Sequence, residues 1–168
     1  MAQDLIDRIM DQWARVAPSL DVSPLAVVSR IIVLAEHLDR RSDQALADDG
    51  VSLWQLDILA ALRRAGPPFA LTPTQLLDSV ILSSGAMTNR IDRLEEKGLV
   101  TRKPDPNDRR GRLITLTARG CKVADEATLT RLNHARGLLS IFSKSEAREL
   151  ASLLRRLLIA VENGNGEH

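Results

Sequence analysis

Residues 71–116 decide the fold, and their sequence is LTPTQLLDSVILSSGAMTNRIDRLEEKGLVTRKPDPNDRRGRLITL. The stretch opens with Thr72 and Pro73, and a hydroxyl residue followed by proline is typical of a helix N-terminus. The apolar spacing after them predicts a short helix that continues to about Ser79. Further along, helical spacing gives way to short β-branched runs, so the stretch predicts helices followed by strands.

A second helix is predicted to begin at Ser83 or Ser84, since either hydroxyl can cap a helix N-terminus. It should end at Lys97, because Gly98 is typical of the residue that terminates a helix. Only a short turn separates this helix from the preceding one. The two together therefore predict a helix-turn-helix.

A β-hairpin is predicted directly after Gly98, with strands over 99–102 and 113–116 and a turn-rich tip over 104–110. Residues 101–112 carry five basic and two acidic side chains, a local charge of +3. Charge alone is more typical of a solvated loop. A basic hairpin that follows a helix-turn-helix, however, is typical of a wing that enters the DNA minor groove.

Helical spacing predicts three helices before this region and two after it. The first three cover residues 5–16, 24 to the 40s and 52–65, and the last two are capped by Thr117 and Ser143. The terminal helices carry more apolar surface than a central unit of about 65 residues would need, so we expect them to pack against a second copy of the chain. The expected fold is mainly α with a small β-hairpin wing. We expect one domain with dimerisation helices over 1–48 and 118–162, a winged lobe over 52–117 and a disordered tail over 163–168.

Composition excludes several classes of protein. The 168 residues are 44% apolar and 27% charged with a net charge of +1, which is typical of a soluble globular domain. No apolar run is long enough to span a membrane and no targeting segment is recognisable, so we expect a cytoplasmic protein. The single Cys121 and the three separated histidines predict no disulfide and no metal site. Cys121 is either a redox sensor or, as is more usual for a lone thiol, inert, and His37 is either a pH-sensitive group or, more commonly, an ordinary helix histidine. No set of catalytic residues can be assembled, so we expect no enzyme.

The second helix of the pair has two distinct faces. Met87, Ile91 and Leu94 have helical spacing and should face the core, which leaves a polar and basic face exposed. Hydroxyls, amides and arginines are the groups that contact base edges and phosphates in a major groove. The candidate DNA-binding residues are Ser83, Ser84, Thr88, Asn89 and Arg93 on the helix, with Asp108, Arg109, Arg110 and Arg112 on the wing.

Residues 83–100, together with Asp105-Pro106-Asn107-Asp108-Arg109-Arg110 and Leu116-Thr117, resemble the signature of the MarR family. The resemblance implies a winged helix-turn-helix homodimer that binds a palindromic site on double-stranded DNA and responds to a small-molecule effector. It also implies that Asp108 orients Arg110, which enters the minor groove. The alternative is an architectural or protein-interaction winged helix with no effector.

Three residues outside the DNA-binding face are candidates for a role other than DNA contact. Asp57 shares a helical face with apolar residues, and a buried carboxylate requires a partner or a purpose. Arg90 lies at the inner edge of its helix, where it can reach the scaffold, so Asp57 and Arg90 form a candidate pair. Trp13 on the first helix is either a plain core aromatic or part of a pocket.

Trp13, Asp57, Arg90 and Arg102 together resemble the urate-responsive, PecS-like branch of the MarR family. The resemblance implies that Trp13 shapes a pocket, that Arg90 and Arg102 bind an anionic ligand, and that the charge of the ligand displaces Asp57. It implies a repressor that urate or a similar anionic aromatic compound releases from its operator, with no cofactor. Four plain structural residues, or a pocket for another aromatic acid, remain the alternatives.

Overall fold

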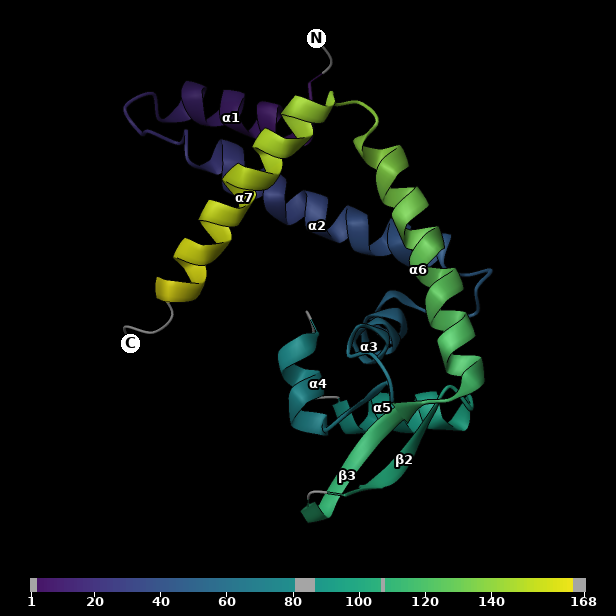
Figure 1. Cartoon of the computed structure of the whole chain (residues 1–168). Coiled ribbons are helices and arrows are strands. Elements are labelled where there is room, and N and C mark those ends of the chain that lie inside the picture. Colours follow the sequence, from purple (N-terminus) through teal and green to yellow (C-terminus); the bar gives the residue numbers. More distant parts are fainter. Residues whose placement is uncertain (1–2, 81–86, 107, 165–168) are drawn as a thin grey trace.

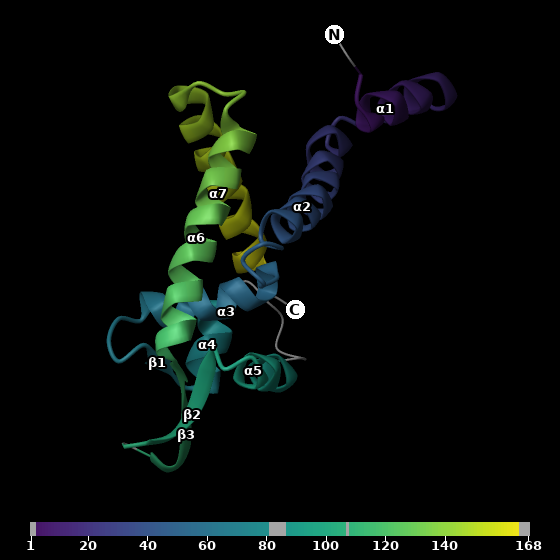
Figure 2. The same cartoon turned by 90° about the vertical axis from the view of Figure 1, so that its right-hand side faces the viewer.

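The computed structural model describes residues 3–80, 87–106 and 108–164, and for residues 109 and 110 it describes the backbone alone. Its elements, in chain order, are α1 (Leu5–Val16), α2 (Leu25–Ala45), α3 (Leu53–Arg64), β1 (Ala70–Leu71), α4 (Pro73–Ser79), α5 (Met87–Glu96), β2 (Val100–Asp105), β3 (Asp108–Leu116), α6 (Ala118–Leu139) and α7 (Lys144–Gly164). We call α3 to β3 the lobe, and α1, α2, α6 and α7 the arms. Figures 1 and 2 show the lobe at one end of the molecule and α1 at the other.

The lobe contains the hydrophobic core of the chain. Helices α3, α4 and α5 pack with an antiparallel sheet in which β3 lies between β1 and β2. Leu56, Leu62, Leu76 and Leu94 are fully buried there, and each contributes roughly 1.5–3 kcal/mol through removal from water. The predicted mainly helical fold with a β-hairpin is therefore confirmed.

The ends of several elements differ from the sequence prediction. The strands of the hairpin are longer than predicted, since β2 continues to Asp105 and β3 begins at Asp108, and β1 was not predicted at all. Helix α2 begins at Leu25, one residue later than predicted, and Pro24 is its N-cap. Helix α7 includes Asn163 and Gly164, so the prediction that these two residues belong to a disordered tail is wrong.

Helix α5 ends at Glu96, one residue before the predicted Lys97, and Gly98 terminates it as the sequence predicts. Gly98 has a φ of 67°, a left-handed conformation that glycine adopts without steric cost. Its backbone N–H donates to the carbonyl of Glu95 at 2.8 Å, and the N–H of Leu99 donates to Leu94 at 2.9 Å. These two bonds form a Schellman motif, which satisfies the last carbonyls of the helix and turns the chain into β2.

Helix α6 is seated on the lobe by its first turn. The Thr117 hydroxyl caps the helix by accepting from the N–H of Gly120 at 2.9 Å. A Cβ at Gly120 would lie 1.9 Å from the carbonyl oxygen of Leu99, so only glycine allows this approach. The start of α6 is therefore fixed against the strand that follows α5.

The arms are much less buried than the lobe. Helices α2 and α7 contain no fully buried residue in the described chain, and Val16 and Ile141 are both 80% exposed. Large apolar side chains also lie exposed along α7, namely Leu150, Leu153, Leu154, Leu157, Leu158, Ile159 and Val161. Contiguous apolar surface of this extent is typical of an interface. No helix in the described ranges is long and apolar enough to cross a membrane.

Candidate nucleic-acid interface and effector site

The outer face of α5 has the polarity that the sequence predicts. Met87, Ile91 and Leu94 are buried, whereas Thr88, Asn89 and Arg93 are exposed on the other side of the helix. An amide, a hydroxyl and a guanidinium thus lie together on one accessible surface, and such groups recognise base edges and phosphates. Ser83 and Ser84, the other two predicted residues of this face, lie outside the described residues.

The wing projects from the lobe beside α5 (Figure 1). Arg112 is exposed and lies opposite Pro104 in the antiparallel register of β2 and β3. Asp108 is exposed at the start of β3. The side chains of Arg109 and Arg110 lie outside the described part of the structure, so the predicted orientation of Arg110 by Asp108 stays a prediction.

Arg102 connects the wing to helix α5. Its guanidinium forms ion pairs with Asp92 and Glu95, and its backbone N–H donates to Oε1 of Glu95 at 3.0 Å. Asp92 and Glu95 are three residues apart on α5, so both carboxylates reach one guanidinium. The hydrogen bond from Arg102 to Asp92 raises the pKa of the guanidinium above its ordinary value. The Arg102 guanidinium is therefore already paired with two carboxylates of α5. Its predicted contact with a ligand stays a prediction.

Asp57 pairs with Arg131, not with Arg90 as the sequence analysis suggested. Nη1 of Arg131 on α6 donates to Oδ1 of Asp57 on α3 at 2.6 Å. The side chain of Asp57 is only 11% exposed, whereas that of Arg131 is 38% exposed. The candidate pairing of Asp57 with Arg90 was wrong because the preferred partner lies 74 positions along the chain.

Arg90 packs over an aromatic ring instead. Its guanidinium carbon lies 5.6 Å from the centroid of the Trp54 ring, a cation–π contact. Its Nη1 atom is buried and has no hydrogen-bond partner among the described residues. A buried donor without a partner costs free energy, so this nitrogen is a favourable position for an acceptor supplied from outside the chain.

Trp13 lies far from the other predicted effector residues within one chain. It is 41% exposed, and with Gln12 and Val16 it lines a shallow pocket on α1. Helix α1 lies at the end of the molecule opposite α5 in both views (Figures 1 and 2). The predicted pocket of Trp13, Asp57, Arg90 and Arg102 is therefore not assembled within a single chain.

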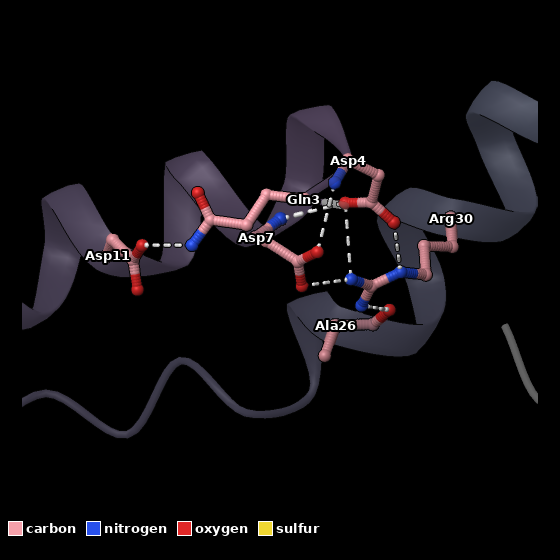
Figure 3. Close-up of polar contacts among 6 residues, drawn as sticks. All are labelled: Gln3, Asp4, Asp7, Asp11, Ala26 and Arg30. Carbon is pink, nitrogen blue, oxygen red and sulfur yellow. Dashed lines mark hydrogen bonds and ion pairs between the residues drawn. The ribbon is translucent and has the colours of Figure 1, made fainter. Parts of the chain in front are cut away.

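An ion-pair cluster holds α1 against α2 (Figure 3). Nε of Arg30 lies 2.8 Å from Oδ2 of Asp4, and Nη2 of Arg30 lies 2.5 Å from Oδ1 of Asp7. Asp4 also caps α1 by accepting from the N–H of Asp7 at 2.8 Å. The hydrogen bond from Arg30 lowers the pKa of Asp4 below its ordinary value. This cluster fixes the start of the helix that carries Trp13.

Comparison with known proteins decides the family. A model described as the MarR family matches residues 49–111. The transcriptional regulator PecS of Dickeya dadantii is 34% identical over 152 residues, which are 90% of this chain and 92% of PecS. The chain belongs to the MarR family. The multiple antibiotic resistance protein MarR of Escherichia coli is 31% identical over 129 residues, which cover 76% of this chain and 88% of that protein.

Solved structures of MarR proteins share the fold. The crystal structure of a mutant of Escherichia coli MarR in complex with operator DNA has a TM-score of 0.71 and 27% identity, and covers 93% of this chain and 99% of that one. This MarR-family protein is accordingly a DNA-binding transcriptional regulator and not an enzyme. Its α5 and its β2–β3 hairpin correspond to the elements that the helix-turn-helix and wing predictions identified.

Sequence reasoning missed two residues of this MarR-family protein that surround the predicted effector site. Arg131 gave no local signal, because its partner Asp57 belongs to a distant helix. Trp54 did have a signal, since it lies three residues before Asp57 and shares a helical face with it. That spacing would have placed an aromatic ring beside the buried carboxylate.

Proposed function

We propose that this protein is a homodimeric repressor that binds a palindromic operator and is released from it by urate or a similar anionic aromatic compound. The observation that carries the DNA-binding part is the exposed face of α5, with Thr88, Asn89 and Arg93, next to the basic wing. The effector part rests on the buried, unpartnered Nη1 of Arg90 over the Trp54 ring. A planar anion satisfies both groups, since it accepts from the guanidinium and stacks on the ring.

The exposed apolar faces of the arms support the homodimer. A second copy that packs against α7 and the distal half of α6 would cover most of the exposed leucines of this chain. A twofold axis between two such copies would place two recognition helices about 34 Å apart, one turn of B-DNA. This spacing matches a palindromic operator whose half-sites lie on one face of the duplex.

Trp13 enters the effector site through the second subunit in this proposal. Within one chain α1, which carries Trp13, lies away from α5, which carries Arg90 (Figure 2), so the proposed dimer has to bring a Trp13 side chain to the lobe. Asp57, held by Arg131, lies one helical turn after Trp54 and next to the proposed anion position. A bound anion would repel its carboxylate and favour the arrangement with lower DNA affinity.

The test is binding of the dimer to its own upstream intergenic DNA at fixed salt, with and without urate. Salt is fixed because phosphate contacts dominate the affinity. We expect urate to release the wild type and the Trp13→Ala dimer to bind DNA but to ignore urate. The Asp57→Ala dimer should bind DNA more weakly than the wild type, because it lacks the ion pair with Arg131, and should also ignore urate. Arg90→Ala, tested with urate by tryptophan fluorescence, should bind urate at least tenfold more weakly, as expected for the loss of about 1.4 kcal/mol or more from a charged hydrogen bond.

Three results would count against parts of this proposal. DNA binding that urate leaves unchanged would remove the urate-type effector and would favour a regulator with a different ligand or with none. A monomer on DNA would remove the dimer. A full response by the Arg90→Ala and Trp13→Ala variants would move the effector site elsewhere in the protein.

A further inference from the structure

Two ion pairs join α3 to α6, and their polarity is opposite. Asp57 on α3 accepts from Arg131 on α6 at 2.6 Å. Six residues further along α3, Arg63 donates to Asp125 at 2.9 and 3.1 Å. Asp125 precedes Arg131 by the same six residues, so the two helices run antiparallel in register. The pairs therefore mark two points along a single helix–helix contact.

The two pairs lie at different positions along α6. Gly120, Ala124 and Ala127 are buried against the lobe, so the first part of α6 belongs to the core. Asp125 lies within this seated part. Arg131 lies beyond the last of these buried residues, between the exposed Leu129 and Leu132. The Asp57–Arg131 pair is thus the contact at the point where α6 leaves the lobe.

Burial makes the pair at the exit the stronger constraint. The two arginines are similarly exposed, at 38% for Arg131 and 40% for Arg63, but the carboxylates differ, since Asp57 is 11% exposed and Asp125 is 56% exposed. Exposed ion pairs contribute little, but loss of one partner from a buried pair leaves an uncompensated charge. The Arg90 guanidinium packs over the ring of Trp54, which lies one helical turn before Asp57. An effector bound at Arg90 and Trp54 would therefore lie next to the Asp57–Arg131 pair.

We propose that the Asp57–Arg131 ion pair fixes the direction in which α6 leaves the DNA-binding lobe, and that Arg131 is thereby a positioning residue for operator binding. The proposal rests on the dimer proposed above, because α6 connects each lobe to the dimerisation helices. A change in the exit direction of α6 alters the separation of the two recognition helices. Two half-sites can be bound together only at one separation.

The experiment measures operator affinity at fixed salt without any added ligand, for full-length protein and its own upstream intergenic DNA. We expect Arg131→Gln and Asp57→Asn to bind about tenfold more weakly than the wild type, within the range of typical coupling between sites. Arg131→Lys should recover part of the loss because it keeps the charge. Asp125→Asn, which breaks the exposed α3–α6 pair, is the matched control and should change the affinity less than twofold.

A second readout separates positioning from stability. Spin labels on Glu96→Cys of α5, in a Cys121→Ser background, report the distance between the two lobes of the dimer by pulsed electron resonance. Arg131→Gln should broaden or shift this distance distribution, and Asp125→Asn should leave it unchanged. If Arg131→Gln fails to fold, the reversed pair Asp57→Arg with Arg131→Asp serves instead, and it should bind the operator more tightly than Asp57→Arg alone.

The proposal is overturned if Arg131→Gln only lowers the melting temperature while the folded dimer keeps the wild-type affinity and distance distribution. It is also overturned if the reversed pair binds no better than Asp57→Arg alone. Failure of the proposed function has a different signature. In that case the wild type is a monomer or does not distinguish its upstream DNA from unrelated DNA, whatever residue occupies position 131.

Discussion

The lobe and the arms differ in how completely a single chain buries their apolar side chains. In the lobe, apolar residues are buried, α5 ends in a Schellman motif, and Arg102 connects the wing to the recognition helix. In the arms, α2 and α7 bury no residue fully within the described chain. The lobe therefore has a complete hydrophobic core, whereas the arms expose apolar side chains of the kind found at interfaces. The chain alone therefore completes the lobe, whereas the burial that α2 and α7 lack is what the proposed dimer would supply.

The largest expected effect comes from the arms. Leu154 and Leu157 lie on one face of α7 and are 44% and 41% exposed in the chain. Their joint replacement by lysine should raise the dissociation constant of the dimer at least a thousandfold, since burial of unpaired charge costs several kcal/mol. Analytical ultracentrifugation measures this constant. The control is Arg155→Ala, which lies away from this face; an unchanged dimer in the double lysine variant would rule out α7 as the interface.

The next effect comes from the junction of the lobe with α6. Gly120→Ala should lower the free energy of unfolding by about 2–3 kcal/mol, because its Cβ would meet the carbonyl oxygen of Leu99. Gly137 lies in the same helix. Apart from its chain neighbours and the backbone of its own helix, no atom of the described residues lies within 4 Å of where a Cβ would be. Gly137→Ala should therefore leave the stability unchanged or raise it by about 0.5–1 kcal/mol. Denaturation in urea measures both, and equal stability of the two variants would show that the close approach at Gly120 does not constrain the fold.

A smaller effect is expected where the wing meets α5. Arg102→Gln removes the ion pairs to Asp92 and Glu95 and should weaken operator binding several-fold, with a loss of stability of about 1 kcal/mol for a partly exposed pair. The salt dependence of binding should stay unchanged, because the Arg102 guanidinium is already paired with Asp92 and Glu95. Arg112→Ala should instead reduce the salt slope by about one. A reduced slope for Arg102→Gln would show that this residue contacts the DNA backbone directly.

The smallest effect concerns the start of α1. The pKa of Asp4 is lowered by its hydrogen bond from Arg30, so the stabilisation is present above the ordinary aspartate pKa of about 3.9 and is lost as pH falls through the lowered value. We expect the emission of Trp13 to change below about pH 4. Arg30→Gln should weaken this dependence at constant helix content by circular dichroism. An identical titration in the Arg30→Gln protein would separate the acid response from this cluster.

Local signals in the sequence predicted most of the lobe, and they singled out Asp57 as a buried carboxylate. The cap at Thr72, the stop at Gly98 and the buried face of α5 all follow from neighbouring residues, and the structure agrees with each of them. Strand β1 has only two residues and forms by pairing with β3, so no local pattern indicates it.

Long-range pairing explains what the sequence analysis of the site missed. Asp57 was identified as a buried carboxylate that requires a partner, and it has one. The partner is Arg131 because α6 folds back along α3, an arrangement that spacing along the chain does not encode. Trp13 likewise lies on α1, at the opposite end of the molecule from the lobe that contains the other three predicted effector residues (Figure 1).

The most direct test of the account is the affinity of the full-length protein for its own upstream DNA and for unrelated DNA at one salt concentration, for the wild type, Asn89→Ala and Arg93→Ala. The account predicts that the wild type distinguishes the two DNAs. Each substitution on the outer face of α5 should cost about 1–3 kcal/mol on the operator, at unchanged thermal stability. Glu96→Ala, at the end of the same helix, is the control. Variants that bind the operator as tightly as the wild type would contradict the assignment of α5 as the recognition helix.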